Sequence, residues 1–182
     1  MKMSCMVCGA HAQITFYDKD DKSIKSYCRS CNNKIMAERH GLENPEYPQE
    51  ITVKPNKGKQ RRFSVEYLIF DGFHALSAYE IGPTQYQCEV TDDYERPFKD
   101  MWDELIRRLK KQISVKYVKK DGSLGDGHKA VGYLMYNDEI DDLAYIVDGI
   151  PYPWKEFIGR HIDNHEGWQL KIEFVPTSVE IE

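Results

Sequence analysis

The chain has 182 residues, of which 41% are hydrophobic and 30% are charged, a composition typical of a folded globular protein. Its length predicts a small module plus one medium-sized domain. No apolar run approaches the roughly 20 residues that a membrane-spanning helix requires, and the first residues contain no apolar signal-peptide core. These features argue against a membrane protein and predict a cytoplasmic location.

The formal net charge of −5 conceals an uneven distribution of charge along the chain. Residues 1–62 contain twelve Lys and Arg against seven Asp and Glu, whereas residues 63–182 contain thirteen against twenty-three. A basic first part predicts either an anionic partner or attraction between the two parts of the chain. The alternative is that solvated charge is simply distributed unevenly.

Four of the five cysteines form two C-x2-C pairs separated by nineteen residues, Cys5 with Cys8 and Cys28 with Cys31. Both thiolates of such a pair can reach one tetrahedral ion, and the intervening segment can return the second pair opposite the first. This spacing predicts one structural Zn²⁺, because four thiolates leave no open coordination position for substrate or water. The fifth, Cys88, is expected to be a small core residue. Four cysteines with metal-ligand spacing and one lone cysteine suit a reducing compartment better than a disulfide framework.

The segment between the two cysteine pairs predicts a hairpin. Residues 13–17 and 23–27 flank the strongly polar segment 18–22, so they are expected to pair as two strands. From Cys31 onward the sequence is compatible with a helix whose C-cap is Gly41. A second ligand pair at the start of a helix is the layout of a treble clef.

Residues 5–41 accordingly resemble a treble-clef four-cysteine zinc finger, with Cys-Met-Val-Cys-Gly, a polar hairpin, Tyr-Cys-Arg-Ser-Cys and then a helix. The spacing is similar to that of GATA-type fingers and of the zinc module at the front of the ClpX unfoldase. Those relatives read DNA in one case and dimerise and bind adaptors in the other, so the resemblance implies metal ligation but no single function. The hydrophobic framework of residues 61–176 resembles an uncharacterised domain that accompanies such fingers, which implies no activity.

Residues 42–60 contain three prolines and little apolar periodicity, and are predicted to be a linker. The end of this segment is the densest basic run in the protein, and its side chains could contact the phosphates of a nucleic acid. The alternative is a solubilising linker that packs against the acidic second part of the chain, residues 63–182, which we call the acidic domain. The candidate nucleic-acid-binding or partner-binding residues are Lys25, Arg29, Lys34, Arg39, Lys54, Lys57, Lys59, Arg61 and Arg62.

Residues 61–182 are predicted to form an α+β domain. Alternating apolar residues predict three antiparallel strands at 63–70, 73–81 and 85–90. A helix is expected to start at the acidic residues 92–95. Its apolar stripe, with three- and four-residue spacing, consists of Phe98, Met101, Trp102, Leu105, Ile106, Leu109 and Ile113.

A second hairpin is predicted at residues 131–136 and 143–147, after a glycine-rich connection at residues 119–128. The connection has neither the Lys-Ser/Thr ending of a phosphate-binding loop nor the ligand spacing of a calcium loop. A short amphipathic helix at 154–162 and a last strand at 168–175 complete the domain.

The predicted fold class is therefore α+β. A small treble-clef zinc module, residues 1–41, is tethered by the linker of residues 42–60 to an antiparallel-sheet domain with the order βββαββαβ and both helices on one sheet face. Without its ion the module should unfold by itself, because so short a segment has too little core to fold alone.

Candidate catalytic residues are confined to the acidic domain, and none completes a catalytic set. His161 and His165 are four residues apart and Glu166 follows, so an unbroken helix would offer a second metal or acid/base site. A metalloprotease helix instead has its glutamate directly after the first histidine, where this chain has Ile162, and Gly167 favours a helix end. The side chains from which a Mg²⁺-dependent nuclease site could be assembled, in many alternative patterns, include Asp148, Lys155, Glu156 and Lys171.

Three functions are compatible with these patterns. The first is a zinc-containing, non-enzymatic binding or adaptor protein that engages a protein or nucleic acid through residues 1–62. The second is a nucleic-acid-binding protein, and the third is a metal-dependent hydrolase or nuclease with its site in the C-terminal domain. The lack of a complete catalytic set in the sequence favours the first.

Overall fold

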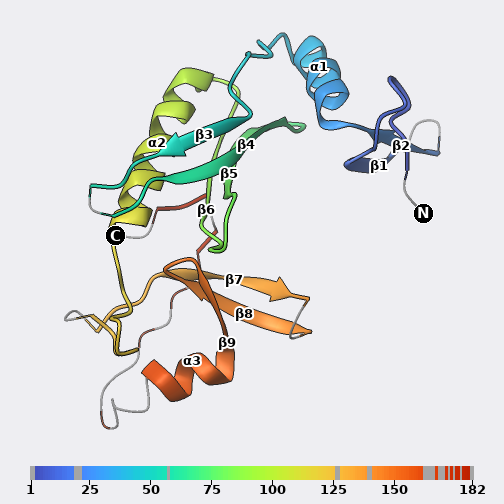
Figure 1. The fold of residues 1–182 in the computed structure, drawn as a ribbon. Helices are drawn as coiled ribbons and strands as arrows, with labels where there is room; N and C mark the ends of the chain where they lie inside the picture. The colour runs from blue at the N-terminus through green and yellow to red at the C-terminus, as the bar shows by residue number, and fades with distance from the viewer. Residues whose placement is uncertain are drawn as a thin grey trace.

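The computed structural model describes residues 3–18, 22–56, 58–125, 128–138 and 141–161, together with residues 167, 171, 173, 175–176 and 178–180. Within this part of the chain the protein is a mixed α+β structure with three helices and three antiparallel sheets, which confirms the predicted fold class (Figure 1). No helix in the described residues is long and apolar enough to cross a membrane.

Each sheet is built from strands that are close in sequence. The first consists of β1 (Ile14–Asp18) and β2 (Ser23–Tyr27), followed by helix α1 (Arg29–His40). The central sheet has the order β3-β4-β5-β6, with β3 (Glu50–Val53), β4 (Arg61–Ile69), β5 (His74–Glu80) and β6 (Gln87–Asp92). Helix α2 (Phe98–Ser114) precedes the third sheet of β7 (Gly132–Asn137), β8 (Asp142–Val147) and β9 (Ile150–Pro153), and α3 (Trp154–His161) follows it.

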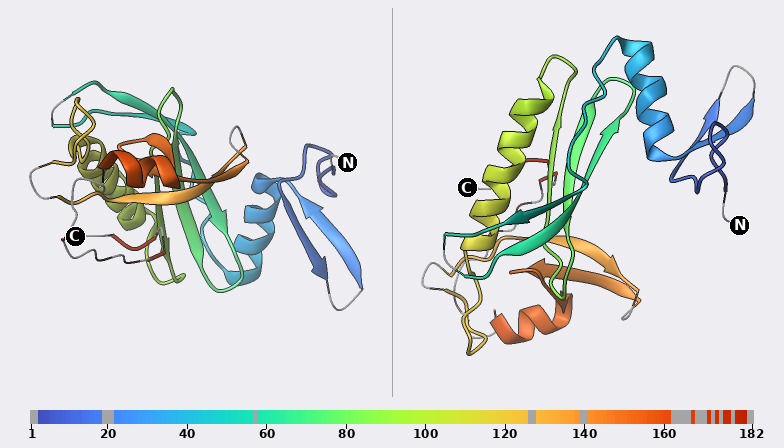
Figure 2. Two further views of the ribbon diagram at one scale, coloured as in Figure 1. Left: turned by 90° about the horizontal axis from the view of Figure 1, so that it is seen from below. Right: turned by 45° about the horizontal axis from the view of Figure 1, so that its top comes forward.

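Helix α2 packs across the central sheet, and the two form the main hydrophobic core (Figure 2). The predicted apolar stripe is confirmed, because Met101, Leu105 and Leu109 are fully buried at four-residue spacing. Alternate residues of β4 enter the same core, as the period-two pattern predicts. These β4 side chains are Phe63, Val65, Tyr67 and Ile69.

Helix α2 begins later than the sequence predicts. Asp92 closes β6, and the Asp93 carboxylate accepts the Glu95 N–H at 3.0 Å within a turn. Pro97 is the N-cap, so the helix starts only at Phe98. The acids of this segment therefore stabilise a turn instead of a first helical turn, a role for which Asp is equally suited.

The segment predicted to be a linker, residues 42–60, contributes a strand and part of the core. Strand β3 pairs with the first residues of β4, and Val53 is buried. Tyr47 packs against Tyr67 and Phe98, and its hydroxyl accepts the Tyr67 N–H at 3.0 Å. The linker prediction is wrong here because four residues between prolines give too little alternation to indicate a strand.

The predicted order βββαββαβ also needs correction. β3 is added before the first three strands, and β9 follows the second hairpin. The strands form separate sheets, so the two later helices do not share one face: α2 packs on the central sheet and α3 on the third (Figure 1). The predicted last strand, residues 168–175, lies largely outside the described residues.

The third sheet packs on both of its faces. On one face, Phe157 of α3 packs against Tyr145 with ring centroids 4.6 Å apart. On the other, Ala144 and Ile146 are fully buried, and the Tyr133 hydroxyl donates to a backbone carbonyl of the loop between β5 and β6. The third sheet is thus joined to the central sheet by packing and by a hydrogen bond.

Buried His74 should make the fold sensitive to acid. Its Nδ1 and the Tyr67 hydroxyl form a hydrogen bond of 2.8 Å, and burial lowers the pKa of the imidazole, partly opposed by the Asp92 carboxylate. The unfolded chain binds this proton more readily, so the contribution of neutral His74 to stability is present above the unfolded value of about 6.5 and is lost as the pH falls below it. His74→Gln should therefore flatten the decrease in urea midpoint between pH 7.5 and 5.5. His11→Gln, which removes an exposed imidazole, is the control, and an equal slope in all three proteins would contradict the prediction.

Candidate metal centre

The four cysteines predicted to bind a metal come together at the base of the β1–β2 hairpin. Their Sγ atoms all lie within 4.8 Å of one another, and the Cys8 and Cys28 Sγ atoms are 3.6 Å apart. All four are free thiols and not disulfides. This cluster can hold one metal ion between its sulfur atoms.

Local backbone geometry explains why the four ligands converge. Gly9 has a φ of 74°, and its N–H donates to the Cys5 carbonyl at 2.9 Å, which closes a tight turn after the first pair. The Met6 N–H donates to the Ser26 carbonyl at 2.9 Å and fastens this turn to β2. The second pair straddles the start of α1, with Cys28 at the N-cap.

Protonation of the cluster shows why a cation suits it. Burial raises the pKa of the Cys5 thiol, but the N–H groups of Cys28, Cys8 and Val7 outweigh burial and lower this pKa to about 6. Hydrogen bonds with the Cys28 and Cys8 thiols raise the pKa of Cys31 to about 12. The cluster therefore retains protons that a bound metal would displace. The affinity for the metal should decrease as the pH is lowered. Four sulfur ligands complete a tetrahedral shell, which is the chemistry of a structural site.

Helix α1 is not tethered at a distance from the second domain, contrary to the prediction. Met36 and Ala37 of this helix belong to the main core, together with residues of β4 and α2. Arg29 forms an ion pair of 2.8 Å with Glu66 of β4. The hairpin projects from the body while α1 lies beside the end of β4 (Figures 1 and 2). The metal centre is thus anchored to the central sheet through the helix that carries half of its ligands.

The asparagine pair, Asn32 and Asn33, makes this anchorage specific. Both side chains are buried. The Asn33 amide donates to the Tyr67 carbonyl at 2.8 Å and its oxygen accepts the Ile69 N–H at 3.0 Å. The Asn32 amide donates to the Ile69 carbonyl at 3.0 Å. Two side-chain amides therefore replace a neighbouring strand along the outer edge of β4.

The asparagine pair was not predicted from the sequence. Two asparagines at positions compatible with a helix have an ordinary explanation as exposed polar residues. The available signal was their position directly after Cys31, because asparagine is a poor helix former and needs a reason to occupy the second turn.

The predicted basic residues do not form one surface. Lys34 and Arg39 are exposed on α1, and Lys25 is half-buried on β2. Arg61 and Arg62 lie at the start of β4, which is roughly 25 Å from its α1-contacting end at a rise of about 3.3 Å per residue. Lys54 and Lys59 are exposed near this second group, and Lys57 lies outside the described residues.

Three of the predicted arginines already have acidic partners. Besides the ion pair of Arg29, Arg61 contacts Glu80 at 2.6 Å and Arg62 contacts Glu50 at 2.5 Å. Arg61 also lies over the Tyr86 ring, 4.7 Å from its centroid. The contacts of Arg29 and Arg61 join the basic first part of the chain to acids that follow residue 62, whereas Glu50, the partner of Arg62, lies in the first part itself.

The speculative second site receives no support from the described residues. His161 ends α3, but its side chain is not among the described ones, and His165 and Glu166 lie outside them. Asp148 accepts the backbone N–H groups of Tyr117 and Val118, which gives its carboxylate a structural role. In the part of the chain that the structure describes, the four cysteines are the sole group with metal-ligand spacing.

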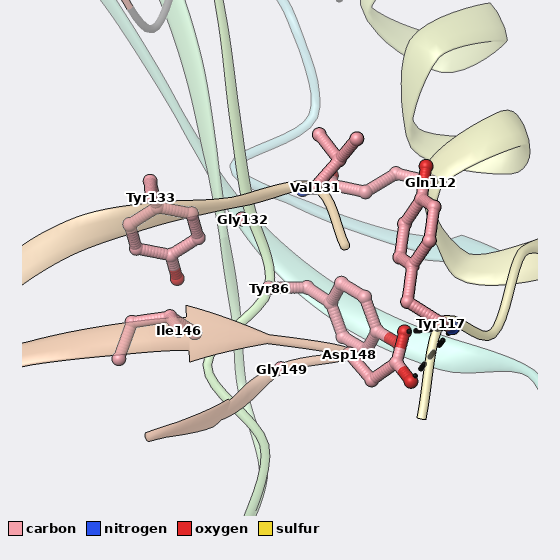
Figure 3. Close-up of a pocket in the computed structure, with 9 residues that line it drawn as sticks. All are labelled: Tyr86, Gln112, Tyr117, Val131, Gly132, Tyr133, Ile146, Asp148 and Gly149. Atoms are coloured by element: carbon pink, nitrogen blue, oxygen red, sulfur yellow. Dashed lines mark hydrogen bonds between the residues drawn. The ribbon is translucent and has the colours of Figure 1, made fainter. Parts of the chain in front are cut away.

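A small cavity lies between the central and third sheets (Figure 3). It measures about 20 Å³, which is room for about one water molecule. Asp148 and the Tyr117 backbone flank it, and burial raises the pKa of the nearby Tyr86 to about 12. Its lining residues are Tyr86, Gln112, Tyr117, Val131, Gly132, Tyr133, Ile146, Asp148 and Gly149. A cavity of this size does not accommodate an organic substrate.

The hairpin beside the metal centre exposes large apolar side chains. Tyr17 and Ile24 are directly opposed across β1 and β2 and are 58% and 59% exposed. Met6 and Val7, between the first two ligands, are 61% and 62% exposed, and Phe16 is exposed on the opposite face of the hairpin. We call Met6, Val7, Tyr17 and Ile24 the hairpin surface. These side chains remain exposed within the small module that the four cysteines hold together.

Comparisons with known proteins match two families of undescribed role. Residues 45–114 are similar to the family described as "Domain of unknown function (DUF7686)", and residues 117–178 to "Domain of unknown function (DUF7713)". No curated protein and no solved structure matches the chain. The four cysteines precede both matched ranges, and the ranges meet just after α2 ends.

Substitution of one of the four ligand cysteines should remove most of the bound metal, whereas substitution of the lone cysteine, Cys88, should not. Cys8→Ser should lower the metal content from about one ion per chain to a small fraction of that, because three thiolates bind less tightly than four. The content is measured by elemental mass spectrometry after gel filtration. Cys88→Ala is the control, since this thiol packs beside the core and burial raises its pKa to about 12. Equal metal content in both variants would contradict the site.

Proposed function

We propose that this chain is a zinc-containing, non-enzymatic binding protein that engages a protein partner through the hairpin surface. The supporting observation is that the module held by the four cysteines exposes the large apolar side chains of the hairpin surface. The metal would fix the hairpin, and the hairpin would supply the contact area.

The ligand set and one sulfur–sulfur distance are compatible with zinc as the bound ion. Zinc–sulfur bonds of about 2.3 Å in a regular tetrahedron place the sulfur atoms about 3.8 Å apart. The Cys8 and Cys28 Sγ atoms, 3.6 Å apart, are close to that spacing. A turn with one ligand pair, a hairpin, and a helix that begins at the second pair also follow the order of a treble clef. Free thiols of this kind fit a reducing compartment such as the cytoplasm.

The hairpin surface suits a protein better than a nucleic acid. Nucleic-acid binding depends on unpaired cations arranged along phosphates, and the predicted basic residues are divided between two ends of β4 with three arginines in ion pairs. Burying an exposed apolar side chain stabilises a complex by about 25 cal/mol per Å². The exposed pair of Tyr17 and Ile24, together with exposed Met6 and Val7 of the same module, offers the aromatic and aliphatic anchors that protein interfaces use.

The hairpin of β7 and β8, in the third sheet, provides a matched control for this proposal. Tyr136 and Leu143 are directly opposed across β7 and β8 and are 53% and 49% exposed, as Tyr17 and Ile24 are across β1 and β2. The two pairs therefore have the same chemistry and similar exposure, and they differ in their distance from the metal centre.

The double variant Tyr17→Ser/Ile24→Ser should reduce partner recovery at least about tenfold, which corresponds to a loss of roughly 1.4 kcal/mol. Partners are recovered from cells by cross-linking to the full-length chain and are quantified by mass spectrometry. Tyr136→Ser/Leu143→Ser should recover them as the wild type does, and both variants should contain the same amount of zinc. Equal recovery by both variants, or no specific partner with the wild type, would overturn the proposal.

A further inference from the structure

Cys31, Asn32 and Asn33 are consecutive, and they join the metal centre to the outer edge of β4. From this connection we infer that the bound metal controls whether the edge of the central sheet is closed. The inference rests on the metal site proposed above, but it does not depend on partner binding. It assigns the metal a role beyond stabilising its own module.

The edge of β4 is covered by three different means. β3 pairs with Arg61–Ser64 only. Farther along, the Val65 N–H donates to the Gln49 carbonyl at 2.8 Å, and the Tyr67 N–H donates to the Tyr47 hydroxyl. The last outward-facing groups, at the end of β4, are met by the asparagine pair alone. Those groups are buried, and leaving them without partners would be costly.

The asparagine pair depends on the first turns of α1. The N-cap residue, Cys28, makes no side-chain hydrogen bond to the helix, and the first turn of α1 contains no acidic residue. The first backbone bond of this region runs from the Asn32 N–H to the Cys28 carbonyl at 3.0 Å.

Gly41 caps the C-terminal end of α1, and the Gln13 side chain accepts the Arg29 N–H at 3.0 Å. A helix of 12 residues with two asparagines and no side-chain cap from its own N-cap residue is still marginal by itself. Met36 and Ala37 anchor the later turns of α1 in the core, and the Arg29–Glu66 ion pair adds a contact at its start. Ligation of Cys28 and Cys31 is the constraint that would fix the first turns, from which Asn32 and Asn33 reach β4.

Loss of the metal should release this end of the sheet. With the first turns of α1 frayed, the Tyr67 and Ile69 groups that face outward lose their partners. An open strand edge can pair with other extended chains. Metal occupancy would thus switch the end of β4 between a closed and an open edge.

Coupling of this kind must act in both directions. If the metal favours the closed edge, the closed edge raises the affinity for the metal by the same factor. Asn33 is not a ligand, yet Asn33→Ala should weaken zinc binding about tenfold. Glu38→Ala, at an exposed position of the same helix, should leave the affinity unchanged. Affinity is measured by competition with a chromophoric chelator on the full-length chain.

Amide exchange on the wild-type protein tests the same inference without a substitution. The Ile69 N–H, bonded to Asn33, should exchange at least about tenfold faster after zinc is removed with a chelator. The Val65 N–H, bonded to Gln49, should change much less, since its partner is not in the metal module. Two-dimensional NMR spectra resolve the two amides.

The outcomes separate this inference from the proposed function. Unchanged Ile69 protection in metal-free protein, or unchanged zinc affinity in Asn33→Ala, overturns the inference even if the hairpin surface binds a partner. Should Asn33→Ala fail to fold, Asn32→Ser removes one hydrogen bond and should show the same effect to a smaller degree. A failed partner test with faster Ile69 exchange would refute the binding role and support the coupling.

Discussion

The outer edge of β4 is the constraint on which the rest of this structure depends. Its backbone groups are buried, so each needs a hydrogen-bond partner. β3 satisfies the first of them. The Gln49 carbonyl, the Tyr47 hydroxyl and side chains of α1 satisfy the others. This requirement explains why a segment with a linker-like composition is ordered. It also explains why the helix of the metal module packs into the core of the central domain.

The same contacts connect the metal centre to the proposed binding role. The start of α1 carries two of the four cysteines, Cys28 at the N-cap and Cys31, and the asparagine pair follows Cys31 directly. A metal that orders the start of this helix fixes both the hairpin surface and the sheet edge. In this account the module can be small because the buried residues of α1 pack into the core of the central sheet. Independent unfolding of the module, which its short sequence predicts, is therefore not what the packing favours.

Sequence patterns predicted the features that repeat regularly or have a fixed spacing. The four cysteines, the α2 stripe through Leu105 and the alternation along β4 belong to this group. The contacts that join the modules could not be predicted, because they depend on single residues from distant segments. Asn33 looks like any polar helix residue until Ile69 is placed beside it. Alternation in residues 13–27 likewise did not reveal that both faces of that hairpin expose apolar side chains.

Unfolding of the zinc-loaded protein, followed by two probes at once, tests most directly whether the metal module and the central sheet form one cooperative unit. Far-ultraviolet circular dichroism reports the sheets and helices, and a zinc-sensitive dye reports release of the metal, during one urea titration. The account predicts that the two transitions coincide. Release of zinc at a lower urea concentration, with no accompanying change in the circular dichroism of the protein, would contradict it.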